Sequence, residues 1–249
     1  MWWFGMTCGG CVTRLELGCK RGFCDGCWPA MEEARRWMLA EEVDLPIAAA
    51  WAYSGPLQAW IARCKNGIYS DPEALLPPLR ELLAECTQEE PLALVAVPPE
   101  KTRLRRRGLH LPDLLVEALH SRLHPRLWAL ERVDRAPVRR DHARQPPTLR
   151  ARVVKNPPHV VLIDDVVTTG QTLATACKAL NAAGVEVRAA ICLADARPAV
   201  LAQILGGTPA DHAPIATAEM PRVHRWARSK TTEKSGMIRP KPQHLRLPK

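Results

Sequence analysis

Residues 159–175, HVVLIDDVVTTGQTLAT, restrict the fold of this chain more than any other stretch. The run over residues 160–163 is β-branched apart from one leucine, which is typical of a strand buried on both faces of a parallel sheet. Two carboxylates follow, then a turn rich in hydroxyl groups, and then helical periodicity over residues 173–183. This order predicts an α/β fold with an anion-binding site at the carboxyl edge of the sheet.

The chemistry of the turn favours a phosphate group. Backbone N–H groups at a helix N-terminus attract anions, and Gly170 allows the backbone to approach a ligand closely. The carboxylates of Asp164 and Asp165 would repel a phosphate, so we expect them to contact sugar hydroxyls or a magnesium ion. The alternative is an ordinary strand, turn and helix in which a threonine caps the helix.

Residues 160–172 resemble the phosphoribosyl-diphosphate (PRPP) binding motif of the type I phosphoribosyltransferases along its full length. The resemblance implies that Asp164 and Asp165 are the catalytic pair that holds the ribose 2′- and 3′-hydroxyls, with Mg²⁺ bound alongside PRPP. It also implies a loop for the 5′-phosphate, formed by Val167, Thr168, Thr169, Gly170, Gln171 and Thr172.

Nine cysteines are present, and five of them fall within residues 8–27. Two CxxC pairs, twelve residues apart, predict a closed tetrahedral zinc site with the ligands Cys8, Cys11, Cys24 and Cys27. A redox pair, free thiols or an iron–sulfur site are the alternatives, and Cys19 is a spare or substitute ligand. The N-terminus lacks the pattern of a signal peptide, and no apolar run reaches the length of a membrane span. We therefore expect a reducing, cytoplasmic location.

The net charge is +9, and 26 arginines stand against 9 lysines. Arginine binds phosphates bidentately and stacks on bases, so this balance favours polyanionic partners, including nucleic acid. A generally basic background is the alternative. The length allows one α/β core with a small additional module.

The predicted organisation has three parts: a zinc finger with a connecting helix at residues 1–42, a phosphoribosyltransferase-like, Rossmann-like domain at 43–205, and a basic, disordered tail at 206–249. Strands are predicted near residues 47–52, 92–97, 128–133, 160–164 and 185–193. Helices are predicted at residues 29–42, 57–64, 72–86, 109–123, 173–183 and 198–205.

Basic residues follow two of these elements. Lys65 ends a helix, where it either complements the helix dipole or serves as a ligand. Residues 101–108 are predicted to form a basic loop after a buried strand, and we expect Arg103 and Arg107 to contact the diphosphate of PRPP. A solvated charge run is the alternative. Residues 135–156 have no periodicity and are predicted to form a long polar loop, in the place of a mobile lid.

Residues 8–197 as a whole are similar to the ComF (ComFC/GntX-like) family, in which a zinc finger precedes a phosphoribosyltransferase-like domain. The similarity rests on the cysteine pairs, the PRPP motif, residues 53–56, Lys65, and Gln145 in the expected lid. The sequence differs from the family at residues 107–111, where it reads RGLHL and the family usually has RGFNQ. The resemblance implies natural competence, with PRPP, single-stranded DNA and other competence proteins as partners.

Three functions remain open on the sequence. The first is a binding protein in DNA uptake that holds a PRPP-like sugar phosphate and single-stranded DNA. The second is an active phosphoribosyltransferase of nucleotide metabolism that uses PRPP and Mg²⁺. The third is a protein that senses PRPP without converting it.

Overall fold

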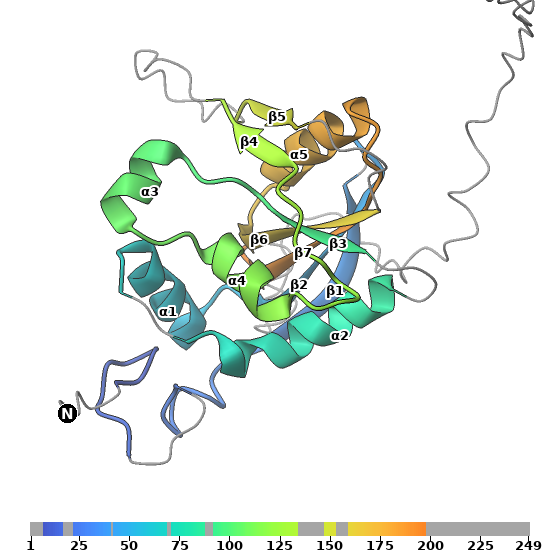
Figure 1. The fold of residues 1–249 in the computed structure, drawn as a ribbon. Helices are drawn as coiled ribbons and strands as arrows, with labels where there is room; N and C mark the ends of the chain where they lie inside the picture. Colours follow the sequence, from blue (N-terminus) through green and yellow to red (C-terminus); the bar gives the residue numbers. More distant parts are fainter. Residues whose placement is uncertain are drawn as a thin grey trace, which may run out of the picture.

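The computed structural model describes residues 7–16, 22–40, 42–68, 71–87, 92–133, 147–152 and 159–197 (Figure 1). The predictions made for Cys19, Gln145, the helix at 198–205 and the tail at 206–249 lie outside these residues. No helix in the described part of the chain is long and apolar enough to cross a membrane.

A five-stranded sheet in the order β1-β2-β7-β6-β3 forms the centre of the fold. Its strands are β1 (Glu33–Ala40), β2 (Leu45–Ala52), β3 (Ala93–Ala96), β6 (Val160–Val167) and β7 (Val187–Asp195). The last four run parallel to one another, and β1 lies antiparallel to β2 at the edge. This is the α/β fold with a largely parallel sheet that the sequence predicts.

Helices cover both faces of the sheet (Figure 1). Apolar side chains of α1, α2 and α4 pack on one face, whereas α5 and the small antiparallel sheet β4–β5 pack on the other. Their bounds are α1 (Gly55–Lys65), η1 (Glu73–Leu75), α2 (Leu76–Cys86), α3 (Lys101–Arg107), α4 (Leu111–Leu119), β4 (Leu130–Arg132), β5 (Leu149–Ala151) and α5 (Gln171–Ala182).

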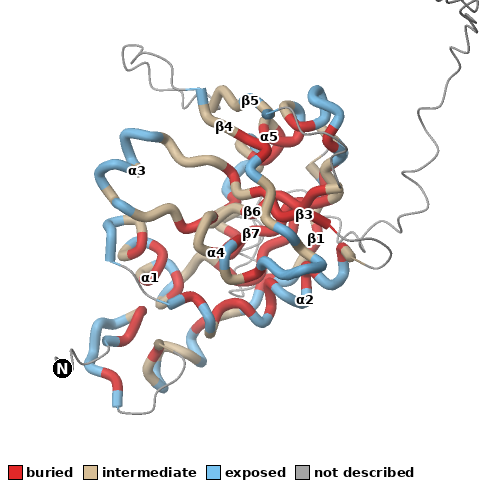
Figure 2. The backbone as a smooth tube through the Cα atoms, in the orientation of Figure 1, coloured by how far each residue is buried: buried red, intermediate tan, exposed pale blue. Residues whose placement is uncertain are grey.

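Alternation along β6 explains its continuous apolar run. Val161 and Ile163 belong to the core under α1, α2 and α4, whereas Val160 and Leu162 belong to the core under α5. All four are fully buried, as the red central strands of Figure 2 indicate. Both faces of the strand are therefore apolar until Asp164.

The helix predicted for residues 29–42 is wrong, because residues 33–40 form strand β1. The two buried residues of β1, Ala34 and Trp37, are three positions apart, a spacing that mimics a helical face. The register of β1 against β2 shifts between Glu33 and Arg36, and this irregularity breaks the strict alternation of a strand. A two-residue period is therefore not visible in the sequence.

The basic loop predicted for residues 101–108 is also wrong, because α3 occupies most of it. The helix ends at Gly108, whose φ of 68° is left-handed, as is common at helix C-termini. None of its residues is buried, so no apolar stripe reveals it in the sequence. The other predicted elements within the described residues are confirmed to within a few residues. The loop predicted for residues 135–156 is wrong at residues 149–151, which form β5 through antiparallel pairing with β4.

Candidate functional site

The acidic pair lies inside β6, and Asp165 is two residues before the strand ends at Val167. Asp165 Oδ2 is 2.8 Å from Lys65 Nζ, and both side chains are partly buried. Lys65 is the last residue of α1, on the face of the sheet toward which Ile163 points. The structure therefore brings together two residues that are a hundred positions apart in the sequence.

Asp164 points to the opposite face, following Leu162 toward α5. Its Oδ1 accepts a hydrogen bond of 2.8 Å from the backbone N–H of Asp165. Although Asp164 keeps some accessible surface, the surrounding protein atoms desolvate its carboxyl group and, with the charge of Asp165, raise its pKa to about 8. A proton or a cation at this position would relieve the repulsion between the two acids.

The predicted phosphate loop connects β6 to α5. Gly170 is the N-cap of α5 with a φ of 78°, a left-handed conformation that glycine adopts without strain. Thr168 and Thr169 are exposed, and the first turn of α5 has no acidic residue. The helix therefore begins beside exposed hydroxyl groups with no side-chain carboxylate to compete for its N–H groups.

Of the two predicted diphosphate ligands, the structure brings only Arg107 next to the end of α1. The carbonyl oxygen of Arg107 lies against Gly67, where an added Cβ atom would be 2.8 Å away. The Nε atom of Arg107 is buried and has no hydrogen-bond partner among the described residues. Arg103, by contrast, is exposed and forms an ion pair of 2.8 Å with Glu100. No described contact joins it to the acidic pair.

Asp195, at the end of β7, is a residue that sequence reasoning missed. Its side chain is only 1% exposed, and two of the guanidinium nitrogens of Arg197 and its backbone N–H donate to it. In the sheet register Asp195 is opposite Val167, where the predicted phosphate loop starts. The signal was an acidic residue directly after a buried strand, the same signal that identified Asp164. In the sequence Asp195 is far from the predicted phosphate loop. Only the pairing of β6 with β7 brings the two together.

One buried thiol, that of Cys192, lies within the electrostatic influence of Asp164, Asp165 and Asp195. Cys192 pairs with Asp164 in the register of β6 and β7. Burial, together with the charges of the three carboxylates, raises the pKa of Cys192 well above its usual range. Cys192 is therefore a neutral core thiol and not a nucleophile.

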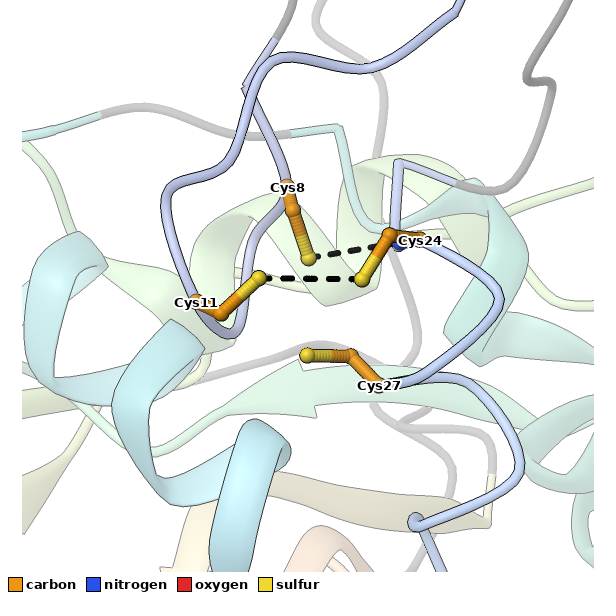
Figure 3. A group of neighbouring side chains, drawn as sticks. All are labelled: Cys8, Cys11, Cys24 and Cys27. Atoms are coloured by element: carbon orange, nitrogen blue, oxygen red, sulfur yellow. Dashed lines mark hydrogen bonds between the residues drawn. The ribbon is translucent and has the colours of Figure 1, made fainter.

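The four predicted metal ligands come together at the N-terminus (Figure 3). The sulfur atoms of Cys8, Cys11, Cys24 and Cys27 all lie within 4.8 Å of one another, and two of them are 3.6 Å apart. A tetrahedral ion with Zn–S bonds of about 2.3 Å requires sulfur separations of about 3.8 Å. The donor set and its spacing fit a zinc ion, and the sulfurs approach one another without forming a disulfide.

The thiols of this cluster differ in their acidity. Hydrogen bonds with the side chain and backbone of Thr13 lower the pKa of Cys11 to about 6. Burial and the neighbouring thiols raise the pKa of Cys27 to about 12. Binding of a thiophilic cation requires all four thiolates, so it would release the proton that Cys27 holds.

One family model matches part of the chain. Residues 119–203 match the family model described as the phosphoribosyl transferase domain. This region contains β6, the predicted phosphate loop, α5 and β7. No curated protein sequence matches the chain.

Among solved structures, the chain is similar to several phosphoribosyltransferases. A hypoxanthine phosphoribosyltransferase from Staphylococcus aureus is 16% identical with a TM-score of 0.32, over 57% of this chain and 68% of that one. An adenine phosphoribosyltransferase from Leishmania tarentolae is 17% identical with a TM-score of 0.33, over 66% and 84%. The same enzyme from Trypanosoma brucei, in complex with AMP, pyrophosphate and ribose-5-phosphate, is 13% identical with a TM-score of 0.34, over 76% and 87%.

The match of residues 119–203 and the parallel order β2-β7-β6-β3 lead to one conclusion. This chain has an α/β fold of the phosphoribosyltransferase type, preceded by a four-cysteine cluster that could hold a metal ion.

Proposed function

We propose that the chain binds PRPP, or a closely related sugar phosphate, together with Mg²⁺ at the carboxyl edge of the sheet. The observation that carries this proposal is the ion pair between Lys65 and Asp165. It places a cation from α1 against an acidic pair that is separated by five residues from the first residue of α5. A site with carboxylates, a cation and a helix N-terminus offers partners to the hydroxyls and to the phosphates of one ligand.

Each part of this ligand has a partner of suitable chemistry. The ribose hydroxyls donate to Asp164 and Asp165, and the 5′-phosphate accepts from the loop that ends at Gly170. Carboxylate oxygens are suitable donors for Mg²⁺, which neutralises charge on the diphosphate when bound. Lys65 is then released from Asp165 to the diphosphate, beside the segment of Arg107, whose carbonyl oxygen lies against Gly67.

The test is a titration of the protein with PRPP in the presence and absence of Mg²⁺, followed by calorimetry. We expect saturable binding that requires Mg²⁺ and that Asp164→Asn together with Asp165→Asn weakens by about tenfold or more, the loss typical of charged hydrogen bonds. Glu186→Gln is the control, because this exposed acid at the opposite end of the sheet pairs with His159. Unchanged affinity in a folded double mutant would refute the proposal.

A second measurement, of diphosphate release, separates binding from catalysis. An active phosphoribosyltransferase would release diphosphate from PRPP when a nucleobase acceptor is present. The match of residues 119–203 to the phosphoribosyl transferase domain is the reason to measure this activity. Diphosphate release that depends on Asp165 would support the transferase, and binding without release would support a sensor or a binding protein.

A role in DNA uptake, of the ComF type, is the broader function that we propose. The observation in its favour is the exposed basic surface of α3, which joins the site through the contact between Arg107 and Gly67. This surface consists of Lys101, Arg103, Arg105 and Arg106, all exposed, and Figure 2 shows α3 mostly in the colour of exposed residues with no buried segment. Single-stranded DNA is a polyanion that such a surface attracts.

This role predicts binding of single-stranded DNA that weakens steeply with salt. Arg105→Ser with Arg106→Ser removes two charges from α3, and we expect the affinity and the salt dependence to fall together. Arg80→Ser with Lys178→Ser is the matched control, because it removes two exposed charges from α2 and α5. Equal losses in both double mutants would show that net charge alone, and not α3, attracts DNA.

A further inference from the structure

The first cysteine pair rests directly on helix α1. A Cβ atom added to Gly9 would lie 2.5 Å from Trp60 Cδ1, and one added to Gly10 would lie 2.8 Å from Pro56 Cβ. Arg63 Nη1 donates a hydrogen bond of 2.8 Å to the carbonyl oxygen of Cys8. The glycines of the CxxC turn are therefore required for this close packing as well as for the turn itself.

The α1 residues that contact the cysteine turn share one face of the helix. Pro56, Trp60 and Arg63 are four and then three positions apart, the spacing of neighbours on a helical surface. Lys65 is two positions beyond Arg63 and thus points to another side, where it pairs with Asp165. The last turn of α1 therefore contacts the cysteine cluster on one side and the acidic pair of β6 on the other.

The geometry of the cysteine turn depends on what holds the four sulfur atoms together. Two thiolates at a separation of 3.6 Å repel each other unless a cation or protons lie between them. A bound cation fixes both pairs, whereas its loss allows Cys8 and its carbonyl oxygen to move. Arg63 would follow that carbonyl, because its guanidinium is the described hydrogen-bonding link from α1 to Cys8.

We infer that metal binding at the four cysteines positions Lys65 against Asp165 through the last turn of α1. Arg63 is the positioning residue in this coupling, since it contacts neither the metal ligands' sulfur atoms nor the acidic pair. The consequence for sugar phosphate binding rests on the proposed function. The coupling to Lys65 itself does not, because it concerns an ion pair of the ligand-free protein.

The test measures the accessibility of Lys65 by brief labelling of lysine amines with acetic anhydride, read residue by residue by mass spectrometry. We expect removal of the metal with a chelator to raise labelling of Lys65 about threefold or more, as the loss of a modest ion pair would. Lys178 is the internal control, because it is exposed, lies on α5 and pairs with Glu42. Unchanged labelling of Lys65 in a folded, metal-free chain would overturn the inference.

A variant decides the case in which removal of the metal unfolds the chain and raises the labelling of Lys65 for that reason alone. Arg63→Met keeps all four cysteines, so we expect one metal ion per chain together with increased labelling of Lys65. Arg80→Met, which removes an exposed arginine from α2, is the control and should leave Lys65 unchanged. Labelling of Lys65 in metal-loaded Arg63→Met equal to that of the wild type would refute the coupling.

Titration with PRPP and Mg²⁺ then separates the two proposals. We expect metal-loaded protein to bind PRPP more tightly than the metal-free protein, and Arg63→Met to bind it with intermediate affinity. If Lys65 responds to the metal but neither form binds PRPP, the proposed function fails and the coupling stands. If both forms bind PRPP equally and Lys65 does not respond, the coupling fails and the proposed function stands.

Discussion

The backbone of Gly67 lies so close to Arg107 that a Cβ atom there would be 2.8 Å from the Arg107 carbonyl oxygen. Gly67 also has a φ of 83°, in the left-handed region. The loop after α1 and the end of α3 are thus held together by a contact that requires glycine. This contact keeps the two cations of the site, Lys65 and Arg107, on neighbouring segments.

Gly67→Ala should therefore lower the free energy of unfolding by more than backbone strain alone. We expect strain of about 1 kcal/mol from the positive φ, and a further loss because α3 must move away from the methyl group. Gly184→Ala is the control, because its φ of 78° imposes similar strain while a Cβ atom there would meet nothing within 4 Å. Thermal unfolding of both variants checks the prediction, and equal losses of stability would contradict it.

The ion pair between Lys65 and Asp165 should make a measurable contribution to stability. A double-mutant cycle with Lys65→Met and Asp165→Asn should give a coupling free energy of about 1 kcal/mol, because both side chains are partly shielded from water. The exposed pair of Arg80 and Glu73 should give a smaller value. Chemical denaturation of the single and double mutants measures both, and a coupling at Lys65 no larger than that at Arg80 would contradict the expected shielding.

Ionisation of Asp164 should make the fold less stable as the pH rises. Its pKa is raised to about 8 in the folded protein, by burial and by the charge of Asp165. Between about pH 4, where the unfolded chain loses this proton, and pH 8, the folded state binds more protons, so this group's contribution to stability falls with pH. Asp164→Asn removes the titrating group and should gain in Tm relative to the wild type across this window, by roughly 2–4 °C per kcal/mol.

Glu131 provides the contrast for this experiment. Its hydrogen bond and ion pair with Arg150 lower its pKa, so Glu131→Gln should not gain stability between pH 5 and 8. Tm values measured in steps from pH 5 to pH 8.5 without Mg²⁺ test both statements. A difference between Asp164→Asn and wild type that is constant over this range would show that Asp164 is already ionised.

Removal of the metal should lower Tm, because the four cysteines lie next to the α1 core. Phe23 and Trp60, both almost fully buried, belong to the same apolar cluster as Cys8. We expect a chelator or Cys11→Ser to lower Tm by at least about 5 °C, since an ion that binds only the folded chain stabilises it. Metal affinity should fall on acidification, because the thiols must lose their protons to bind.

Cys177→Ala is the control for the metal prediction. Cys177 is a buried residue of α5 in the core on the other face of the sheet from Cys8, and burial raises the pKa of its thiol. This variant should lose some packing stability but still bind one metal ion per chain. Elemental analysis of both variants provides the measurement, and full metal content in Cys11→Ser would contradict the four-cysteine assignment.

The sequence by itself determined the parts of this protein that depend on local order. The continuous apolar run before Asp164 specified a strand buried on both faces, and the periodicity after the turn specified α5, which begins at Gln171, two residues earlier than predicted. The two CxxC turns likewise specified a cluster of four sulfurs, because each turn fixes its own pair. These features were predictable because the residues that determine them are close together in the chain.

The tertiary structure alone decided which distant residues meet. Strand β1 was not predictable because an irregular register gave Ala34 and Trp37 a helical spacing, and only pairing with β2 reveals the strand. Asp195 lies opposite Val167, at the start of the predicted phosphate loop, through the register of β7 against β6. Lys65 reaches Asp165 because α1 packs across the sheet, and Arg103 turns to Glu100 instead of to the site. Such contacts depend on strand order and helix packing, which the local pattern of residue types does not encode.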